Sequence, residues 1–378
     1  MARINYAISG FGKHGARHSL ETKWIPALKK RCQFIAAYDP DEKVLEKIQK
    51  ANGIDVDTFD DLLSMAQWDA IIVASPPEHH AAQVIAALES GLHVYSEVPM
   101  ALTNNDVEKI IAAEDASGKC YQLGENYCFF PEVLFAGEMS SGGKFGKIVK
   151  VECEFLIDET RKAWLYNPTA KLSNIMPKKI SWFQEIYPLM YGHSIGPAQV
   201  AIGGIDAPVT FKEVVACSNN IGDRDDAPFI FERTDSFHEA LFYTDAGAIA
   251  QCANAFIYHW KHSNKVLRVI GKKGEYWTNK IGGHGRLRSL LMDNEGTTNK
   301  IKYKSRRIGQ MSLWKRIKPV LGNYHGANTR IKINWFDAIN TGIKPSLHAR
   351  VGGNMTSAGI AARKATKSRS SVKIASFD

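Results

Sequence analysis

The sequence predicts an α/β protein with two domains: an N-terminal doubly wound parallel sheet, and a C-terminal α+β domain with a large, mostly antiparallel open sheet. Three observations predict this fold class. Short apolar runs alternate with helical patterns up to about residue 123, which is typical of βαβ units. A glycine-rich turn joins the first of these runs to a helix. Beyond about residue 146, longer segments alternate apolar and polar residues, as antiparallel strands with one packed face do.

The first strand, over Ile4–Ser9, turns directly into a helix through Gly10, Phe11, Gly12, Lys13, His14 and Gly15. In such a turn the first glycine allows the sharp bend and the second leaves room for a pyrophosphate against bare backbone. The third glycine lets the helix pack closely on the strand. Free amide groups at the helix N-terminus would bind the diphosphate. The stretch therefore predicts a dinucleotide-binding turn.

A carboxylate follows the second strand. The apolar run of residues 34–38 ends at Asp39, at about the distance from the glycines where an acid can hold the adenosine ribose hydroxyls. No arginine comes directly after it to bind a 2′-phosphate, so the sequence favours NAD over NADP. Asp39 can also cap the following helix, and the two roles are compatible.

The other elements of the first domain alternate in the same way. The expected helices cover residues 16–30, with an interruption at Pro26, and residues 41–51, 78–90 and 104–117; the expected strands cover residues 69–74, 92–95 and 120–123. The fully apolar run of residues 69–74 is typical of a buried parallel strand. We expect the dinucleotide-binding domain to cover residues 1–125.

The second domain is expected to cover residues 126–378, to bind substrate and to oligomerise. Its expected strands cover residues 147–157, 209–216, 236–244, 248–256 and 265–270, and its expected helices cover residues 330–341 and 353–366. Residues 161–184, rich in Trp, Pro and Lys, are interpreted as a loop over the cleft, and residues 279–328 show no clear pattern. Packing of the C-terminal helices back on the first domain is left open.

Composition excludes several classes of protein. The 378 residues are 44% hydrophobic and 23% charged, which suits a globular chain of two domains. No apolar run approaches the length of a membrane span, and no signal peptide precedes the first strand, so we expect a cytoplasmic protein without a membrane partner. The six cysteines lack paired spacing, and we expect buried thiols and no metal site.

Part of the net charge of +9 comes from a basic region over residues 302–318. No nucleic-acid-binding motif accompanies it, so we expect no nucleic-acid partner. The region is interpreted as a solvated loop, or else as a surface that attracts an anionic substrate such as a phosphorylated or nucleotide-linked sugar.

Ligands of open α/β sheets bind beyond the carboxyl ends of the strands. Three stretches come directly after predicted strands: Ser75, Pro76 and Pro77; residues 96–99 with Glu97; and residues 124–127 with Asn126. We expect all three to line one cleft beside the glycine turn. Glu97 either hydrogen-bonds cofactor hydroxyls or caps a helix, and Asn126 is either a ligand or a turn residue.

In this order the motifs resemble those of the Gfo/Idh/MocA family, the glucose-fructose oxidoreductase and inositol dehydrogenase group. The resemblance rests on the glycine turn, Asp39, residues 75–77 with His80, residues 91–94 before Glu97-Val98-Pro99, Asn126 with Pro131, residues 145–148, His193, residues 268–274 and the final helices. It implies an N-terminal Rossmann domain, a nicotinamide cofactor, and oxidation or reduction of a sugar or cyclitol carbon. It also implies a homodimer or homotetramer formed through the open sheet.

The resemblance further implies the residues of the site. The cofactor positions are Gly10, Phe11, Gly12, Lys13, His14, Gly15, Asp39, Ser75, Pro76, Pro77, His80, Glu97 and Asn126, and the substrate positions are Asn126, Tyr191 and His193. His193 is the expected catalytic group, because an imidazole can take a hydroxyl proton near neutral pH while hydride leaves the same carbon. Without the resemblance, a lone histidine before an apolar helix is more often structural.

Some positions depart from the family pattern. Val98 stands where the usual Glu-Lys-Pro triplet has its catalytic lysine, and Leu189 stands where an acid precedes the histidine. The Glu-Val-Pro triplet, residues 125–128 and residues 193–197 are similar to family 109 glycoside hydrolases, which regenerate NAD in each cycle. Met190 replaces the tyrosine of that branch, for which Tyr187 and Tyr191 are candidate substitutes.

The leading hypothesis is an NAD-dependent oxidoreductase acting on a secondary hydroxyl or ketone of a sugar or sugar derivative. The first alternative is a redox-neutral glycosidase, lyase or epimerase with tightly bound NAD. The second alternative is a non-catalytic cofactor-binding protein, which the valine at position 98 suggests.

Overall fold

The computed structural model describes residues 3–65, 67–157, 190, 192–219, 237–256, 266–278, 285–291, 302–308 and 326–377. The chain divides into two compact units. Unit 1 comprises Met1–Phe129, Pro319–Ser357 and Ser376–Asp378, and unit 2 comprises Phe130–Lys318 and Ala358–Ala375. This division differs from a single cut after residue 125, because a segment from the C-terminal part of the chain joins unit 1.

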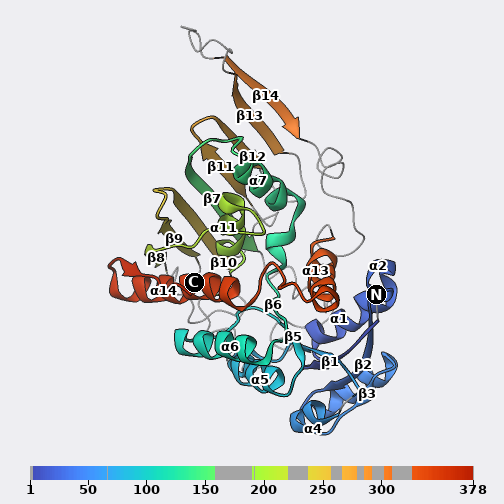
Figure 1. Cartoon of the computed structure of the whole chain (residues 1–378). Coiled ribbons are helices and arrows are strands. Elements are labelled where there is room, and N and C mark those ends of the chain that lie inside the picture. Colours follow the sequence, from blue (N-terminus) through green and yellow to red (C-terminus); the bar gives the residue numbers. More distant parts are fainter. Residues whose placement is uncertain are drawn as a thin grey trace, which may run out of the picture. The chain divides into compact units, whose positions relative to one another are not determined.

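Unit 1 is built on a six-stranded parallel sheet with the order β3-β2-β1-β4-β5-β6 (Figure 1). The strands are β1 (Ile4–Ser9), β2 (Cys32–Tyr38), β3 (Ile54–Asp55), β4 (Ala70–Val73), β5 (His93–Ser96) and β6 (Tyr121–Leu123). β4 is buried along its whole length, as a parallel strand covered on both faces should be. The order confirms the predicted doubly wound sheet, and its switch point lies between β1 and β4.

Helices connect these strands. They are α1 (Lys13–Trp24), α2 (Pro26–Lys29), α3 (Leu45–Lys50), α4 (Phe59–Ser64), α5 (Pro77–Glu89) and α6 (Asn104–Ser117), with 3-10 helices at Glu42–Val44 and Asn126–Phe129. The helix expected over residues 16–30 is divided at Pro26, as predicted, but it begins at Lys13 because the glycine turn leads straight into it. β3 and α4 were not predicted from the sequence, because they are too short for a periodic pattern.

Aromatic packing holds α13 (Ala327–Thr341) in unit 1. The Phe336 ring lies 6.0 Å from the ring of Tyr6 on β1, and the Trp335 ring lies 5.6 Å from the ring of Tyr95 on β5, measured between ring centroids. Trp335 and Phe336 are both fully buried. This burial of large aromatic surface explains why a helix so late in the sequence packs with the first strands.

Unit 2 is built on a nine-stranded sheet with the order β14-β13-β12-β11-β7-β10-β9-β8-β15 (Figure 1). The strands are β7 (Ile148–Ile157), β8 (Glu213–Asn219), β9 (Phe237–Tyr243), β10 (Ile249–Phe256), β11 (Leu267–Gly271), β12 (Gly274–Thr278), β13 (Gly285–Leu291), β14 (Lys302–Ile308) and β15 (Val372–Lys373). β7 and β10 pair in parallel and the other neighbours are antiparallel. The large, mostly antiparallel sheet is therefore confirmed.

Two helices of unit 2, α7 (Pro131–Ser141) and α11 (Ile195–Gly203), pack against each other, and α11 also contacts β7. Their backbones approach closely at Gly137, where a Cβ atom would lie 2.6 Å from the carbonyl oxygen of Val200. The side chains of β9 alternate between buried and more exposed positions, so one face of the sheet is packed. This alternation is the one that the sequence predicted for antiparallel strands.

Several expected boundaries in the C-terminal half are corrected. The strand expected over residues 209–216 begins only at Glu213, and residues 279–328, which showed no pattern, include β13 and β14. These two strands contain many charged residues, so an alternation of apolar and polar residues is not recognisable in the sequence. The last helices, α13 and α14 (Ala349–Ser368), begin earlier than residues 330 and 353. The loop expected over residues 161–184 lies outside the described residues.

Candidate functional site

The glycine turn leaves the N-terminus of α1 without a side-chain cap. Gly12 is the N-cap, its backbone is extended, and the first turn of the helix contains no acidic residue. Lys13 and His14 occupy that first turn and are exposed. Because the first amide groups of a helix have no partner within the helix, this end can bind an anionic group.

The three glycines have different surroundings. Gly10 has a φ of +84°, and a Cβ atom on it would lie 2.5 Å from the backbone nitrogen of Ser75. A Cβ atom on Gly15 would lie 2.0 Å from the carbonyl oxygen of Gly10. A Cβ atom on Gly12, by contrast, would meet no atom within 4 Å. Gly10 and Gly15 therefore serve backbone packing, whereas Gly12 borders open space.

Asp39 lies at the end of β2, directly beside this turn. Its Oδ2 accepts a hydrogen bond of 2.7 Å from the backbone N–H of Phe11, and its Oδ1 accepts one of 3.0 Å from the N–H of Asp41. The carboxylate thus joins the glycine turn to the turn after β2. Backbone donors fix its position, and it remains half-buried.

The stretch after β4 is held by two polar side chains of α5. The Ser75 hydroxyl donates to Gln83 Oε1 at 2.7 Å, while Pro76 and Pro77 form the N-cap and first residue of α5. The ring nitrogens Nδ1 and Nε2 of His80 lie 2.8 Å from the carbonyl oxygens of Pro99 and Ser75. Burial lowers the pKa of His80, although both carbonyl oxygens favour its charged form. His80 therefore ties the stretch after β4 to the stretch after β5.

Glu97, at the end of β5, pairs with a histidine of α1. Its Oε1 lies 2.7 Å from Nε2 of His18, and the two side chains are 15% and 3% exposed. The sequence predicted Glu97 either as a ligand of cofactor hydroxyls or as a helix cap, and did not predict this pair. Burial raises the pKa of Glu97, but the His18 ring, with the charges of His14 and Arg17, outweighs burial and holds the pKa below its usual value.

His18 is the neutral partner of this pair. Burial, followed by the charge of Lys332, lowers the pKa of His18 to about 4, so at neutral pH its Nε2–H donates to the ionised Glu97. Among the described residues, its Nδ1 has no hydrogen-bond partner. The pair connects α1, which begins at the glycine turn, to the end of β5.

Asn126 begins the 3-10 helix after β6. Its backbone N–H donates to the carbonyl oxygen of Gly124 at 2.8 Å. Asn126 therefore lies in a turn, which is one of the two roles that the sequence left open for it. Its side-chain Nδ2 donates to Oδ1 of Asn328 on α13 at 2.5 Å. Asn328 in turn donates to Glu21 on α1, and Lys332 of α13 also pairs with Glu21.

His193 comes two residues before α11 in unit 2 and is half-buried. The centroid of its ring lies 4.6 Å from that of Phe155 on β7, with the planes at 60°. Tyr191, predicted with it as a substrate residue, lies outside the described residues, as do Tyr187 and Leu189. The predicted cofactor residues, Asn126 included, are all in unit 1, whereas His193 is in unit 2.

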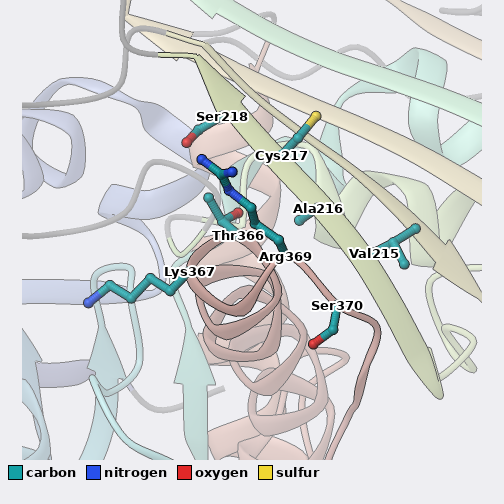
Figure 2. A pocket seen from close by; sticks show the side chains of 8 residues that line it. All are labelled: Val215, Ala216, Cys217, Ser218, Thr366, Lys367, Arg369 and Ser370. Carbon is teal, nitrogen blue, oxygen red and sulfur yellow. The ribbon is translucent and has the colours of Figure 1, made fainter.

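A cavity of about 720 Å³ lies in unit 2, and none of its lining residues is a predicted site residue. Figure 2 shows its lining, which comes from β8, the end of α14 and the two residues that follow this helix. Lys367 and Arg369 are among its eight lining residues, and none of the eight is acidic. In the part of the chain that the structure describes, no cluster of three metal-ligating side chains is found and no helix is long and apolar enough to cross a membrane.

Sequence reasoning missed four polar residues of unit 1. His18 and Glu21 lie one turn apart on α1, and Asn328 and Lys332 lie one turn apart on α13. All four are buried. Their helical spacing on faces that pack into the unit was a signal, since polar side chains on such faces need partners.

Comparison with known proteins identifies the domain that contains the glycine turn. Residues 4–125 match the model of the Gfo/Idh/MocA family, an oxidoreductase family with an NAD-binding Rossmann fold. The match includes Asp39, His80 and Glu97, and it confirms over residues 4–125 the resemblance that the sequence motifs predicted.

Two relatives are similar to this chain over different lengths. A 2,7-anhydro-N-acetylneuraminate hydratase of Mediterraneibacter gnavus is 26% identical over 278 residues, which cover 72% of this chain and 67% of the hydratase. A glycosyl hydrolase family 109 protein of Stenotrophomonas maltophilia is 32% identical over 124 residues, which cover 32% of this chain and 27% of that protein. The match thus spans about a quarter of the family 109 relative.

The fold is shared with solved structures. Levoglucosan dehydrogenase, solved in complex with NADH and levoglucosan, matches with a TM-score of 0.76 at 18% identity. The alignment covers 99% of this chain and 100% of that one. The likeness shows a common fold.

Proposed function

We propose that this chain, whose residues 4–125 form the NAD-binding Rossmann domain of the Gfo/Idh/MocA oxidoreductase family, transfers hydride between NAD and a secondary hydroxyl or ketone carbon of a sugar or sugar derivative. The observation that carries the proposal is the uncapped N-terminus of α1, with open space over Gly12 and Asp39 fixed beside it.

The residues of unit 1 suit NAD. The amide groups after Gly12 would bind the diphosphate, and Asp39 would accept hydrogen bonds from the adenosine ribose hydroxyls. Its negative charge would repel a 2′-phosphate, which supports NAD over NADP. The stretches that contain Ser75, Glu97 and Asn126 would line the rest of the cofactor site. The nicotinamide ring supplies the hydride acceptor or donor when NAD is bound.

For the proton that accompanies hydride transfer, we propose His193. A neutral imidazole can take the proton of a substrate hydroxyl and return it in the reverse direction. The Phe155 ring packs against that of His193 and limits its orientations. Tyr191, two residues earlier, is proposed as a substrate contact on the sequence resemblance alone.

The names of two similar proteins support a carbohydrate substrate. One relative is a hydratase of 2,7-anhydro-N-acetylneuraminate, and the levoglucosan dehydrogenase was solved with levoglucosan. Both ligands are anhydro sugars with secondary hydroxyl groups. The net charge of +9 also suits a nucleotide-linked sugar as the substrate.

A second candidate function is redox-neutral, a glycosidase, lyase or epimerase reaction in which bound NAD is regenerated in each cycle. Val98 favours it, because valine cannot transfer a proton where the family triplet has lysine. The hydratase and the family 109 hydrolase among the relatives also favour it. In such a reaction a transient ketone acidifies the neighbouring C–H bond, so elimination becomes possible without net oxidation.

One experiment separates these functions. Candidate sugars are incubated with the protein and NAD in deuterated water, and reduced nicotinamide and deuterium incorporation are both measured. Stoichiometric reduction of NAD supports the oxidoreductase, and deuterium beside the oxidised carbon without net reduction supports the redox-neutral enzyme. If NAD binds but neither signal arises from any sugar tested, the non-catalytic alternative replaces both.

The role of His193 has its own test. His193→Ala should abolish turnover while leaving the dissociation constant of NAD unchanged, whereas the exposed His79→Ala is the matched control and should keep both. Turnover that survives in His193→Ala at the wild-type rate would refute the assignment.

We also propose a cytoplasmic homodimer or homotetramer. All six cysteines are free thiols, which suits a reducing compartment. The sheet of unit 2 has one packed face, and Val149 and Tyr243 on its strands are 47% and 39% exposed. Light scattering on the purified chain measures the mass directly, and a monomer at micromolar concentration would refute this part of the proposal.

A further inference from the structure

A series of hydrogen bonds within unit 1 connects α1 and α13 to Asn126. Asn126 Nδ2 donates to Asn328 Oδ1 at 2.5 Å, and Asn328 Nδ2 donates to Glu21 Oε1 at 3.1 Å. Lys332 Nζ donates to the other oxygen of Glu21. Asn328, Glu21 and Lys332 are 5%, 6% and 1% exposed, whereas Asn126 is half-buried and is the end nearest to solvent.

Glu21, at the ionised end of this series, determines which group donates in each of its hydrogen bonds. Burial raises the pKa of Glu21, but the charge of Lys332 and the hydrogen bonds from Lys332 and Asn328 outweigh burial and lower the pKa to about 2. His18 contributes as well, because it is protonated at the low pH at which Glu21 titrates. A carboxylate only accepts hydrogen bonds. Asn328 must therefore turn its NH₂ group toward Glu21 and its carbonyl oxygen toward Asn126.

The same constraint passes on to Asn126. Because the oxygen of Asn328 faces it, Asn126 must turn its own NH₂ group toward Asn328, and its Oδ1 is left on the other side of the amide. The two ends of an amide are alike in shape, so an isolated asparagine can present either end. Here the buried carboxylate removes that freedom.

We propose that Asn328 and Glu21 are positioning residues, which hold the Asn126 carboxamide with its oxygen toward the carboxamide NH₂ group of bound NAD. This inference rests on the proposed function, in which Asn126 lines the cofactor site. Asn126 follows β6, in the β4–β5–β6 half of the sheet, whereas Asp39 follows β2 in the other half. A dinucleotide lies across the switch point with one half on each side.

With Asp39 on the adenosine half, Asn126 belongs to the nicotinamide half. The donor that distinguishes this half of the cofactor is the carboxamide NH₂ group, and a carbonyl oxygen is its complement. An acceptor held in place favours one orientation of the carboxamide, and with it one orientation of the ring, before hydride transfer.

The test compares NAD with 3-acetylpyridine adenine dinucleotide, in which a methyl group replaces the carboxamide NH₂. Dissociation constants for the full chain are measured by calorimetry. Wild type should prefer NAD by about tenfold, the effect of one hydrogen bond. Asn328→Ala releases Asn126, so the preference should fall to about twofold or less. Asn328→Ser, which shortens the side chain, carries the same expectation and replaces the alanine variant if that variant does not fold.

Asn328→Asp distinguishes positioning from a general structural role. Aspartate still accepts from Asn126, so the preference for NAD should be retained, even though a second carboxylate then lies beside Glu21. If Asn328 had only a structural role, Asn328→Asp would lose more of the preference for NAD than Asn328→Ala. Asn340→Ala is the matched control, since Asn340 lies on the same helix and donates to the Phe336 carbonyl oxygen instead.

The inference is overturned if wild type binds both dinucleotides equally, or if Asn328→Ala keeps the full preference. A wild-type protein that binds neither dinucleotide would refute the proposed function as well, so the two failures are distinguishable.

Discussion

Acid should destabilise unit 1 through His18. This histidine lies on α1 with 3% of its side chain exposed, and burial lowers its pKa from 6.5 to about 4, with a further contribution from the charge of Lys332. The folded-state pKa thus lies below that of the unfolded chain, which takes up its proton first as the pH falls. The contribution of His18 to stability is therefore complete above pH 6.5 and is lost between pH 6.5 and about 4.

The size of the loss follows from the two pKa values. At about 1.4 kcal/mol per pKa unit, the interval from 6.5 to about 4 corresponds to about 3 kcal/mol in the free energy of unfolding. His18→Gln is the appropriate perturbation, because the glutamine amide can still donate to Glu97 but does not titrate. The variant should therefore lose about 3 kcal/mol less than wild type between pH 7.5 and 4.

Urea unfolding, followed through tryptophan fluorescence, to which the buried Trp68 and Trp335 of unit 1 contribute, measures this difference. The exposed His79→Gln is the control for a histidine-to-glutamine change and should follow the wild-type profile. Parallel profiles for wild type and His18→Gln over this pH range would refute the reasoning. The pair also connects α1 to β5, so we expect NAD affinity of the wild type to weaken over the same interval.

Four further predictions concern unit 1. Gly15→Ala should lower the free energy of unfolding by about 3 kcal/mol or more, because its Cβ atom would lie 2.0 Å from a backbone oxygen. Gly12→Ala should leave the melting temperature unchanged but weaken NAD binding at least about tenfold, since its Cβ atom occupies the open space. Thermal melts and calorimetry check both, and a stable Gly15→Ala protein would contradict the packing argument. Asp39→Ala should weaken NAD binding by about tenfold or more and reduce the preference for NAD over NADP, because two charge-assisted hydrogen bonds to the ribose are lost. Unchanged dissociation constants for both cofactors would show that Asp39 does not bind the cofactor. Lys332→Met should lower the free energy of unfolding by about 3–5 kcal/mol, because it leaves Glu21 buried without its cation. Adding Glu21→Leu should recover part of this loss, as measured by urea unfolding. A double variant less stable than the single one would show that the ion pair is not the cause.

Local patterns predicted much of the fold. The strand–turn–helix around Gly10 and Gly15 follows from the backbone itself, since only glycine fits a positive φ or a Cβ-free contact at these positions. The run at β4 is apolar on both faces and therefore predicts a buried parallel strand. Where local signals were weak, as in the two-residue strand β3 and in the charged strands β13 and β14, the prediction failed or was not made.

The sequence by itself determined the fold class and the strand–turn–helix at the glycines, because these depend on residues close together along the chain, and the order of its motifs gave the family resemblance. The role of Asp39 in binding the dinucleotide stays a prediction. His193 and Tyr191 as substrate residues stay predictions. Only the tertiary structure decided the partners of the buried polar groups. His18 meets Glu97 across 79 positions, and Glu21 meets Lys332 across 311. Such pairs depend on which helix faces pack together, and that packing is set by the whole apolar core rather than by any local stretch of sequence.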